Sequence, residues 1–141
     1  MNRSKRELER LKRTAKAEGL WEDQRFRDEI AKLEIDIVAL EMMVLRVLSA
    51  EKSGKQSLDV AGLLKIRGSE ITQRVAELLM LAVGPMALPS IHEAMEAGWQ
   101  GDQYLAHCAP LAGSYFNNRK TTIYGGSNEV QRNIVAQTVL G

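Results

Sequence analysis

The sequence predicts an all-α protein: an up-and-down four-helix bundle with short additional helices. Three observations support this fold class. The 141 residues include only three prolines, so long stretches carry no helix breaker. Apolar residues recur three and four positions apart, as they do on one face of a helix. No segment of any length alternates apolar and polar residues as a strand would.

The first predicted helix covers residues 4–18 and is highly charged, and Gly19 ends it. Residues 3–16 carry seven basic side chains against Glu7 and Glu9. A nucleic acid is one partner that such a helix can bind, through its phosphates. The acids interrupt the basic run, however, and no aromatic residues are interleaved with it. We therefore favour a solvated helix face and expect no nucleic-acid partner.

A second, long helix is predicted over residues 22–53. One apolar stripe runs its full length: Phe26, Ile30, Leu33, Ile37, Leu40, Val44 and Val47. A second stripe starts halfway along: Ile35, Val38, Met42, Leu45 and Leu48. We therefore expect the C-terminal half to be buried on several sides. The helix would be about 45 Å long, which suggests that it extends into a larger assembly.

A third helix is predicted over residues 58–83, after a turn formed by SGKQS at 53–57. Its apolar face carries Leu64, Ile71, Val75, Leu78 and Ala82. Gly68 falls on that face, and glycine inside a helix is unfavourable by roughly 1 kcal/mol relative to alanine. We therefore expect a neighbouring backbone to approach closely at Gly68.

Three shorter helices complete the prediction. Ser90 and Glu93 fit a capping box for a helix over 91–97. Residues 102–119 are predicted to be helical, with a kink or break at Pro110. Asn128 is expected to cap a last helix over 129–139, with Glu129 favourably placed in its first turn.

Composition excludes several classes of protein. The formal net charge is +1 and the single cysteine, Cys108, rules out an internal disulfide framework. No apolar run reaches the roughly 18 residues that a membrane span needs. The charged N-terminus lacks the apolar segment of a secretory signal. His92, His107 and Cys108 do not form a zinc-ligand pattern, so we expect no metal. We interpret the chain as a cytoplasmic domain.

The segment IYGGSNEVQ is the most specific candidate site. It places Gly125, Gly126 and Ser127 directly before a predicted helix N-terminus. Free backbone N–H groups and the positive end of the helix dipole favour an anion there, and glycines let a ligand approach the backbone. The alternative is an ordinary glycine turn followed by a capped helix.

The longer stretch IYGGSNEVQRNIVAQTVLG resembles the terminal signature of the flavin-dependent acyl-CoA dehydrogenases. That signature runs Ile-Tyr-(Glu/Gly)-Gly-(Thr/Ser), then a few residues, then (Ile/Val)-Gln-Arg-Asn-Ile, and ends in Val-Leu-Gly. The segments LEIDIVALE and LLKIRGSEITQRVAELLMLAVGPMALP resemble the family more loosely. The resemblance implies the C-terminal helical domain of a longer, three-domain chain, so residues 1–141 are expected to be one such domain.

The resemblance also implies ligands and site residues. Ser127 matches a flavin contact, Glu129 a nearby polar FAD contact, and Gly84 a turn that meets the neighbouring subunit's FAD. Tyr124 and Gly126 match residues at the thioester end of the acyl-CoA site. In this family, FAD-dependent α,β-dehydrogenation passes electrons to an electron-transfer flavoprotein or similar acceptor. The enzymes are oligomers assembled largely through these bundles, so a homo- or hetero-oligomer is expected.

The catalytic base of many relatives follows the signature tyrosine, and here that position is Gly125. A glycine cannot remove a proton. Other branches place a glutamate before an arginine on the first long helix, which makes Glu9 a candidate, but we favour a base upstream of residue 1. Pro85 and Gln137 also depart from the family pattern and indicate a divergent branch. A non-catalytic partner subunit or binding module of the same fold is the alternative function.

Overall fold

The computed structural model describes residues 2–52 and 58–140, and these residues form helices and connecting turns without any strand. The all-α prediction is confirmed. The α-helices are α1 (Asn2–Ala17), α2 (Gln24–Lys52), α3 (Leu58–Val83), α4 (Gln103–Asn118) and α5 (Asn128–Leu140). Short 3₁₀-helices join them: η1 (Leu20–Glu22), η2 (Gly84–Ala87), η3 (Glu93–Met95) and η4 (Arg119–Thr122). The turn predicted at 53–57 lies outside the described residues.

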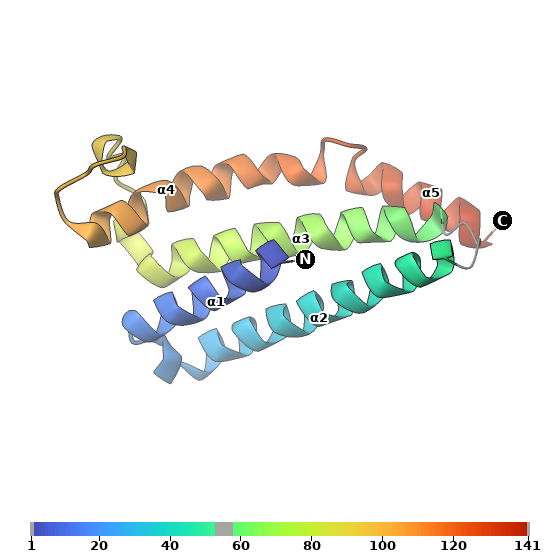
Figure 1. The fold of residues 1–141 in the computed structure, drawn as a ribbon, viewed down its shortest axis with the longest axis horizontal. Helices are drawn as coiled ribbons and strands as arrows, with labels where there is room; N and C mark the ends of the chain where they lie inside the picture. The colour runs from blue at the N-terminus through green and yellow to red at the C-terminus, as the bar shows by residue number, and fades with distance from the viewer. Residues whose placement is uncertain (1, 53–57, 141) are drawn as a thin grey trace.

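Helix α3 is the centre of the bundle, because α1, α2, α4 and α5 all pack against it. Figure 1 shows α1, α2 and α3 as successive antiparallel helices, while α4 and α5 follow one another along the remaining side of α3. The buried core draws residues from α1, α2, α3 and α4, and its most enclosed large side chains are Leu11, Leu33, Leu78 and Cys108. The fold is therefore an up-and-down bundle whose fourth member is interrupted by a loop.

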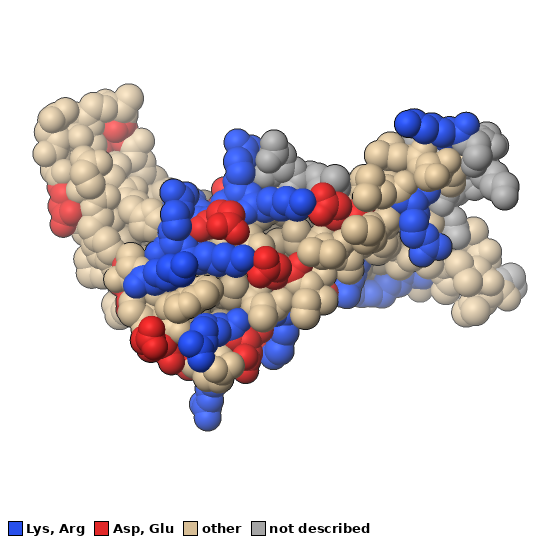
Figure 2. All heavy atoms as spheres, turned by 60° about the horizontal axis from the view of Figure 1, so that its bottom comes forward, with Lys and Arg blue, Asp and Glu red and all other residues tan. Residues whose placement is uncertain are grey.

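The charged helix α1 is amphipathic. Leu8, Leu11 and Ala15 are buried, and the basic side chains lie on the other faces. Two of the lysines reach α2: Lys5 pairs with Glu41 at 2.8 Å and Lys12 with Glu34 at 2.9 Å. Figure 2 shows acidic and basic side chains intermingled over the middle of this face of the molecule. These pairs favour the interpretation of a solvated helix face.

The two apolar stripes of α2 have different surroundings. The first stripe packs inward, with Ile30, Leu33 and Ile37 buried. The second stripe is exposed, and its side chains retain about half or more of their accessible surface: Ile35 68%, Val38 47%, Met42 54%, Leu45 48% and Leu48 49%. The prediction that this half of α2 is buried on several sides is therefore wrong for the single chain, because none of the helices described over residues 2–52 and 58–140 covers the second stripe.

The prediction of a capped helix over 91–97 is also wrong, and the break that Pro110 could have caused does not occur. The segment predicted as a helix over 91–97 is only the 3₁₀ turn η3, without a side-chain cap. The Ser90 hydroxyl lies 3.3 Å from His92 Nδ1 instead. Helix α4 runs through Pro110 without a break. The buried neighbours Cys108, Ala109 and Leu111 hold this part of α4 against the core, so packing maintains the helix around the proline.

The close helix approach expected at Gly68 occurs at Gly62 instead. A Cβ at Gly68 would meet nothing within 4 Å, whereas one at Gly62 would lie 3.0 Å from Gln131 Oε1 and 3.0 Å from Val135 Cγ2. The glycine in the first turns of α3 therefore allows α5 to pack closely there.

Candidate functional site

The candidate site is the loop of residues 123–127 between η4 and α5. Tyr124 is 57% exposed and Ile123 is 69% exposed, so their side chains pack little against the rest of the chain. Gly125 and Gly126 have φ values of 68° and 84°. Residues with a Cβ rarely adopt this left-handed backbone, so the glycine pair is explained by the shape of the loop.

The surroundings of the two glycines differ. A Cβ at Gly125 would meet nothing within 4 Å. At Gly126 it would lie 2.6 Å from Gln131 Nε2, which donates a hydrogen bond to the Gly125 carbonyl at 3.4 Å. Position 125 follows the signature tyrosine, where many proteins with this signature carry a catalytic base. Here the position is exposed and open, but it has no side chain.

Ser127, rather than Asn128, caps α5. The Ser127 hydroxyl accepts a hydrogen bond from the Val130 N–H at 3.3 Å, and its carbonyl accepts one from the Gln131 N–H at 2.9 Å. The prediction that Asn128 is the cap is wrong by one residue. Asn128 is 3% exposed, and its side chain is turned towards α3, away from the free N–H groups of α5.

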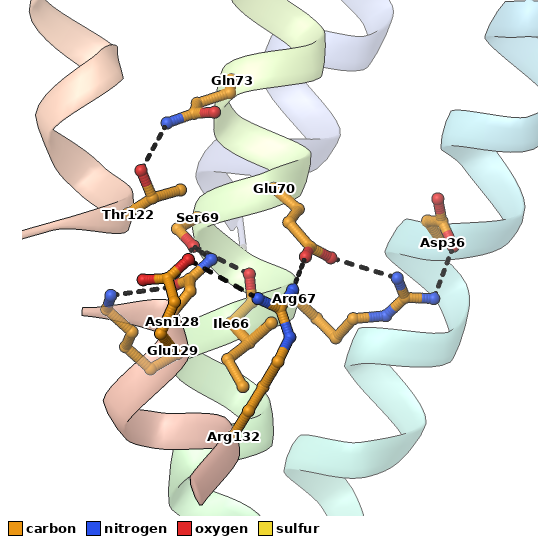
Figure 3. A network of polar contacts seen from close by, with 11 residues as sticks. Asp36, Ile66, Arg67, Ser69, Glu70, Gln73, Thr122, Asn128, Glu129 and Arg132 are labelled. Atoms are coloured by element: carbon orange, nitrogen blue, oxygen red, sulfur yellow. Dashed lines mark hydrogen bonds and ion pairs between the residues drawn. The ribbon is translucent and has the colours of Figure 1, made fainter. Parts of the chain in front are cut away.

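Asn128 joins α5 to α3 through a buried polar cluster (Figure 3). Its Oδ1 accepts a hydrogen bond from Lys65 Nζ at 2.8 Å, and its Nδ2 donates to Ser69 Oγ at 3.2 Å. The Ser69 hydroxyl in turn donates to the Ile66 carbonyl at 2.8 Å. Every polar atom named here has a partner, which is what buried polar groups require.

Glu129 lies in the first turn of α5 with its side chain exposed. The hydrogen bond from its own backbone N–H, followed by that of the Ser127 hydroxyl, holds the pKa of the Glu129 carboxyl below its ordinary value. The charges of Arg132 and Lys65 act in the same direction. The start of α5 is therefore an electropositive environment that favours negative charge.

A chain of ion pairs crosses from α5 to α2 by way of α3. Arg132 pairs with Glu70 at 2.9 Å, Glu70 with Arg67 at 3.2 Å, and Arg67 with Asp36 at 3.3 Å. Figure 3 shows these side chains pointing towards one another across the three helices. They are part-exposed, so each pair contributes modestly to stability, but together they orient α5 on α3.

The structure does not bring all the predicted site residues together. Gly84 lies in η2, at the opposite end of α3 from the Lys65–Asn128 contact, a separation of about 28 Å along the helix axis. It has a left-handed φ of 57°. Ser127, Glu129, Tyr124, Gly125 and Gly126 lie together, so Gly84 belongs to a different surface from the loop.

Glu9 lies on the exposed side of α1, where it pairs with Lys12 at 3.5 Å. It does not line the groove that α1, α3 and α4 form, which has a volume of about 350 Å³. The carboxylate on that groove is Glu7, beside Arg3 and Arg10. Within this chain, Glu9 therefore lacks the water-excluded surroundings that a catalytic carboxylate needs.

Sequence reasoning missed the polar row on α3 formed by Lys65, Ser69 and Gln73. Its signal was present: polar residues four positions apart on a helix whose other side carries the core residues. The groove was missed as well, because its lining comes from helices far apart in the sequence.

His107 and Cys108 are separate features. His107 Nε2 lies 3.3 Å from the Thr14 hydroxyl, while Cys108 is fully buried in the core. Across residues 2–52 and 58–140, no three histidine, cysteine, aspartate or glutamate side chains gather as metal ligands. Nor does any helix in this part of the chain have the length and apolar character of a membrane span.

Comparison with known proteins bears on what this loop belongs to. A family model described as "Acyl-CoA dehydrogenase, C-terminal domain" matches residues 2–140. The acyl-CoA dehydrogenase IpdE1 of Mycolicibacterium smegmatis is 28% identical over 136 residues. The match covers 96% of this chain and 30% of that protein, so the chain spans less than a third of its relative's length. No solved structure gives a significant match.

Proposed function

Because the chain belongs to the family of acyl-CoA dehydrogenase C-terminal domains, we propose that it is the C-terminal helical domain of an FAD-dependent acyl-CoA dehydrogenase. In such an enzyme the Cα proton and the Cβ hydride leave an acyl-CoA thioester to form a double bond. The observation that carries the proposal is the 123–127 loop: two left-handed glycines and a serine directly before the positive end of α5. The parent is proposed to be a longer three-domain chain in the cytoplasm.

The residues of the loop suit a flavin. Ser127 offers a hydroxyl at a helix N-terminus, and Gly125 leaves the backbone accessible. FAD, when bound, supplies the acceptor for the Cβ hydride. Ser127 and Glu129 are the proposed FAD contacts of this chain, and Gly84 is proposed to meet the FAD of a neighbouring subunit. The separation of Gly84 from the loop is compatible with that division.

Acyl-CoA binding is proposed for the same loop. Tyr124 and Gly126 would lie at the thioester end, where the exposed tyrosine ring excludes water from the reacting carbons. The base that removes the Cα proton is proposed to come from outside residues 1–141. Gly125 has no side chain, and Glu9 is solvated and paired with Lys12.

Two kinds of partner complete the proposal. Reduced enzyme is proposed to pass its electrons to an electron-transfer flavoprotein or similar acceptor. A homo- or hetero-oligomer is proposed to form through the exposed second stripe of α2, where five large apolar side chains meet solvent in the single chain.

The proposal is tested with the purified protein that contains this chain. We expect bound FAD, and loss of flavin absorbance when acyl-CoA thioesters of varied chain length are added without oxygen. A protein that retained no FAD, or whose flavin stayed oxidised with every thioester, would refute dehydrogenase function.

Ser127 gives the matched test of the loop. We expect Ser127→Ala to weaken FAD binding by about tenfold, the loss of one hydrogen bond, and Ser127→Thr to restore it. The control is Thr138→Ala on α5, because the Thr138 hydroxyl bonds only to the Ile134 carbonyl of its own helix. Equal FAD affinity for Ser127→Ala and Thr138→Ala would remove Ser127 from the site.

The missing carboxylate at Gly125 favours a second candidate, a non-catalytic partner subunit of the same fold. That candidate predicts FAD or acyl-CoA binding without flavin reduction by the protein alone, and turnover only after a second subunit is added.

A further inference from the structure

Three polar residues of α3 face the α4–α5 side of the bundle: Lys65, Ser69 and Gln73. They are spaced four residues apart and so share one face of the helix. Each side chain hydrogen-bonds to the chain segment next to the 123–127 loop. Gln73 bonds to the turn before the loop, and Lys65 and Ser69 bond to Asn128 directly after it. None of the three was placed among the proposed ligand contacts.

Gln73 holds the entry to the loop. Its Nε2 lies 3.1 Å from the Asn118 carbonyl, 3.2 Å from the Arg119 carbonyl, and 3.3 and 3.4 Å from the hydroxyls of Thr121 and Thr122. The amide has two N–H groups, so it satisfies two of these acceptors at a time. The Asn118 and Arg119 carbonyls also accept hydrogen bonds from the hydroxyls of Thr121, at 2.7 Å, and Thr122, at 3.2 Å. Gln73 adds a donor from a neighbouring helix and so ties the end of α4 to α3.

Asn128 holds the exit. It is 3% exposed and is fixed by both Lys65 and Ser69, as described above. Substituting Ser69 by a residue without a hydroxyl would leave the buried Asn128 Nδ2 without its acceptor, which is more costly than losing an exposed hydrogen bond. The two anchor points on α3, Ser69 and Gln73, are separated by one helical turn, about 6 Å along the axis.

Between these anchors the loop is held by few contacts, among them the hydrogen bond from Gln131 Nε2 to the Gly125 carbonyl. Ile123 and Tyr124 are largely exposed, and two glycines have the greatest backbone freedom of any residue. An unanchored loop would have to be ordered when a ligand binds, and that ordering would weaken binding.

We infer that Gln73, Lys65 and Ser69 are positioning residues, which hold both ends of the 123–127 loop on the rigid helix α3 and so pre-form the contact surface for flavin and thioester. The inference rests on the proposed function for what the loop contacts. The anchoring itself is independent of it and is measured separately below.

The experiment compares wild type with Gln73→Leu in the purified, FAD-loaded protein that contains this chain. Leucine keeps a similar volume and the helix propensity but donates no hydrogen bond. We expect backbone amides of residues 119–127 to exchange hydrogen about tenfold faster, and FAD to dissociate about tenfold more readily. Exchange in α2 is expected to stay at the wild-type rate, which a general loss of stability would not allow.

Ser69→Ala is the second variant, because alanine favours the helix and removes only the hydroxyl that Asn128 contacts. We expect it to speed amide exchange at the start of α5, and it decides the question if Gln73→Leu fails to fold. The matched control is Gln103→Leu at the far end of α4, since the Gln103 side chain hydrogen-bonds to the nearby Gly101 carbonyl rather than to the loop.

Two results would overturn the inference: wild-type exchange at 119–128 in both variants, or faster exchange with unchanged FAD affinity. If the wild-type protein binds no FAD, the proposed function fails, and the exchange rates of the FAD-free protein still decide whether α3 anchors the loop.

Discussion

Gly125 and Gly126 share a left-handed backbone but not a common environment, and this gives a matched pair of substitutions. We expect Gly125→Ala to reduce the free energy of unfolding by about 1 kcal/mol, the cost of placing a Cβ in that conformation. Gly126→Ala should cost about 1 kcal/mol more, because its Cβ displaces the Gln131 amide from the Gly125 carbonyl. Urea denaturation measures both, and equal losses would show that Gln131 adapts freely.

His107 predicts a pH dependence of stability. Partial burial, then the charge of Arg10, lower the pKa of its imidazole below 6.5, with Glu18 opposing and Arg13 adding to the effect. Below pH 6.5 the unfolded chain therefore binds a proton that the folded chain does not. We expect the free energy of unfolding to fall as pH drops through this range and to level off below the folded pKa.

The measurement is thermal unfolding of wild type and His107→Gln between pH 8 and pH 5, a range spanning about 1.5 units on either side of the ordinary histidine pKa. The variant should lose less stability across this range than wild type. His92→Gln, at an exposed histidine directly before η3, is the control for the loss of one imidazole.

At the scale of single residues, the sequence predicted which residue types form the loop but not the role of each one. Ser127 and Asn128 are both good cap residues, and nothing in their chemistry says which one caps α5. The choice depends on which side chain finds partners on α3, and Lys65 and Ser69 lie about sixty positions earlier in the chain. The glycine loop and the helix that follows it were predictable, but their contacts with α3 were not.

At the scale of elements, the two glycines of α3 make opposite predictions. Gly68→Ala should stabilise the protein by about 1 kcal/mol, because its Cβ meets nothing within 4 Å and alanine is the better helix former. Gly62→Ala should destabilise it by about 1–3 kcal/mol, since its Cβ pushes against Gln131 and Val135 of α5. Denaturant melts of both variants check this, and stabilisation by Gly62→Ala would contradict the close packing of α5.

The helices themselves were largely predictable, because burial on one face leaves a periodic trace. The range predicted for the third helix, 58–83, is the range of α3, and the inward stripe of α2 packs as expected. The short η3 turn and the unbroken α4 were not predictable, since local breakers compete there with packing by distant residues. The spacing of apolar residues therefore locates a helix better than capping residues and prolines locate its ends and breaks.

At the scale of the molecule, the uncovered second stripe of α2 predicts self-association. We expect the wild-type protein to sediment as an oligomer and Leu45→Glu to shift it towards monomer, because a charge in an apolar interface is strongly unfavourable. Met95→Glu is the control: Met95 is also exposed, at 50%, but lies in η3 rather than on α2 or η2. A wild-type monomer at every concentration would refute the prediction.

Of the predictions made for the whole molecule, two are confirmed and one is wrong for the single chain. The all-α class and the family were reached from periodicity and one specific stretch, and both are confirmed. The second stripe of α2 was read as buried because apolar composition does not distinguish the inside of a chain from a surface that another chain covers.

The exposed stripe has a consequence for how the stability of this protein is measured. If association covers those apolar side chains, folding and assembly obey one law of mass action, and the melting temperature rises with protein concentration. A melting temperature would then be valid only at the protein concentration at which it was measured. Variants such as Gly68→Ala should be compared with wild type at equal molarity, and Leu45→Glu should abolish the concentration dependence.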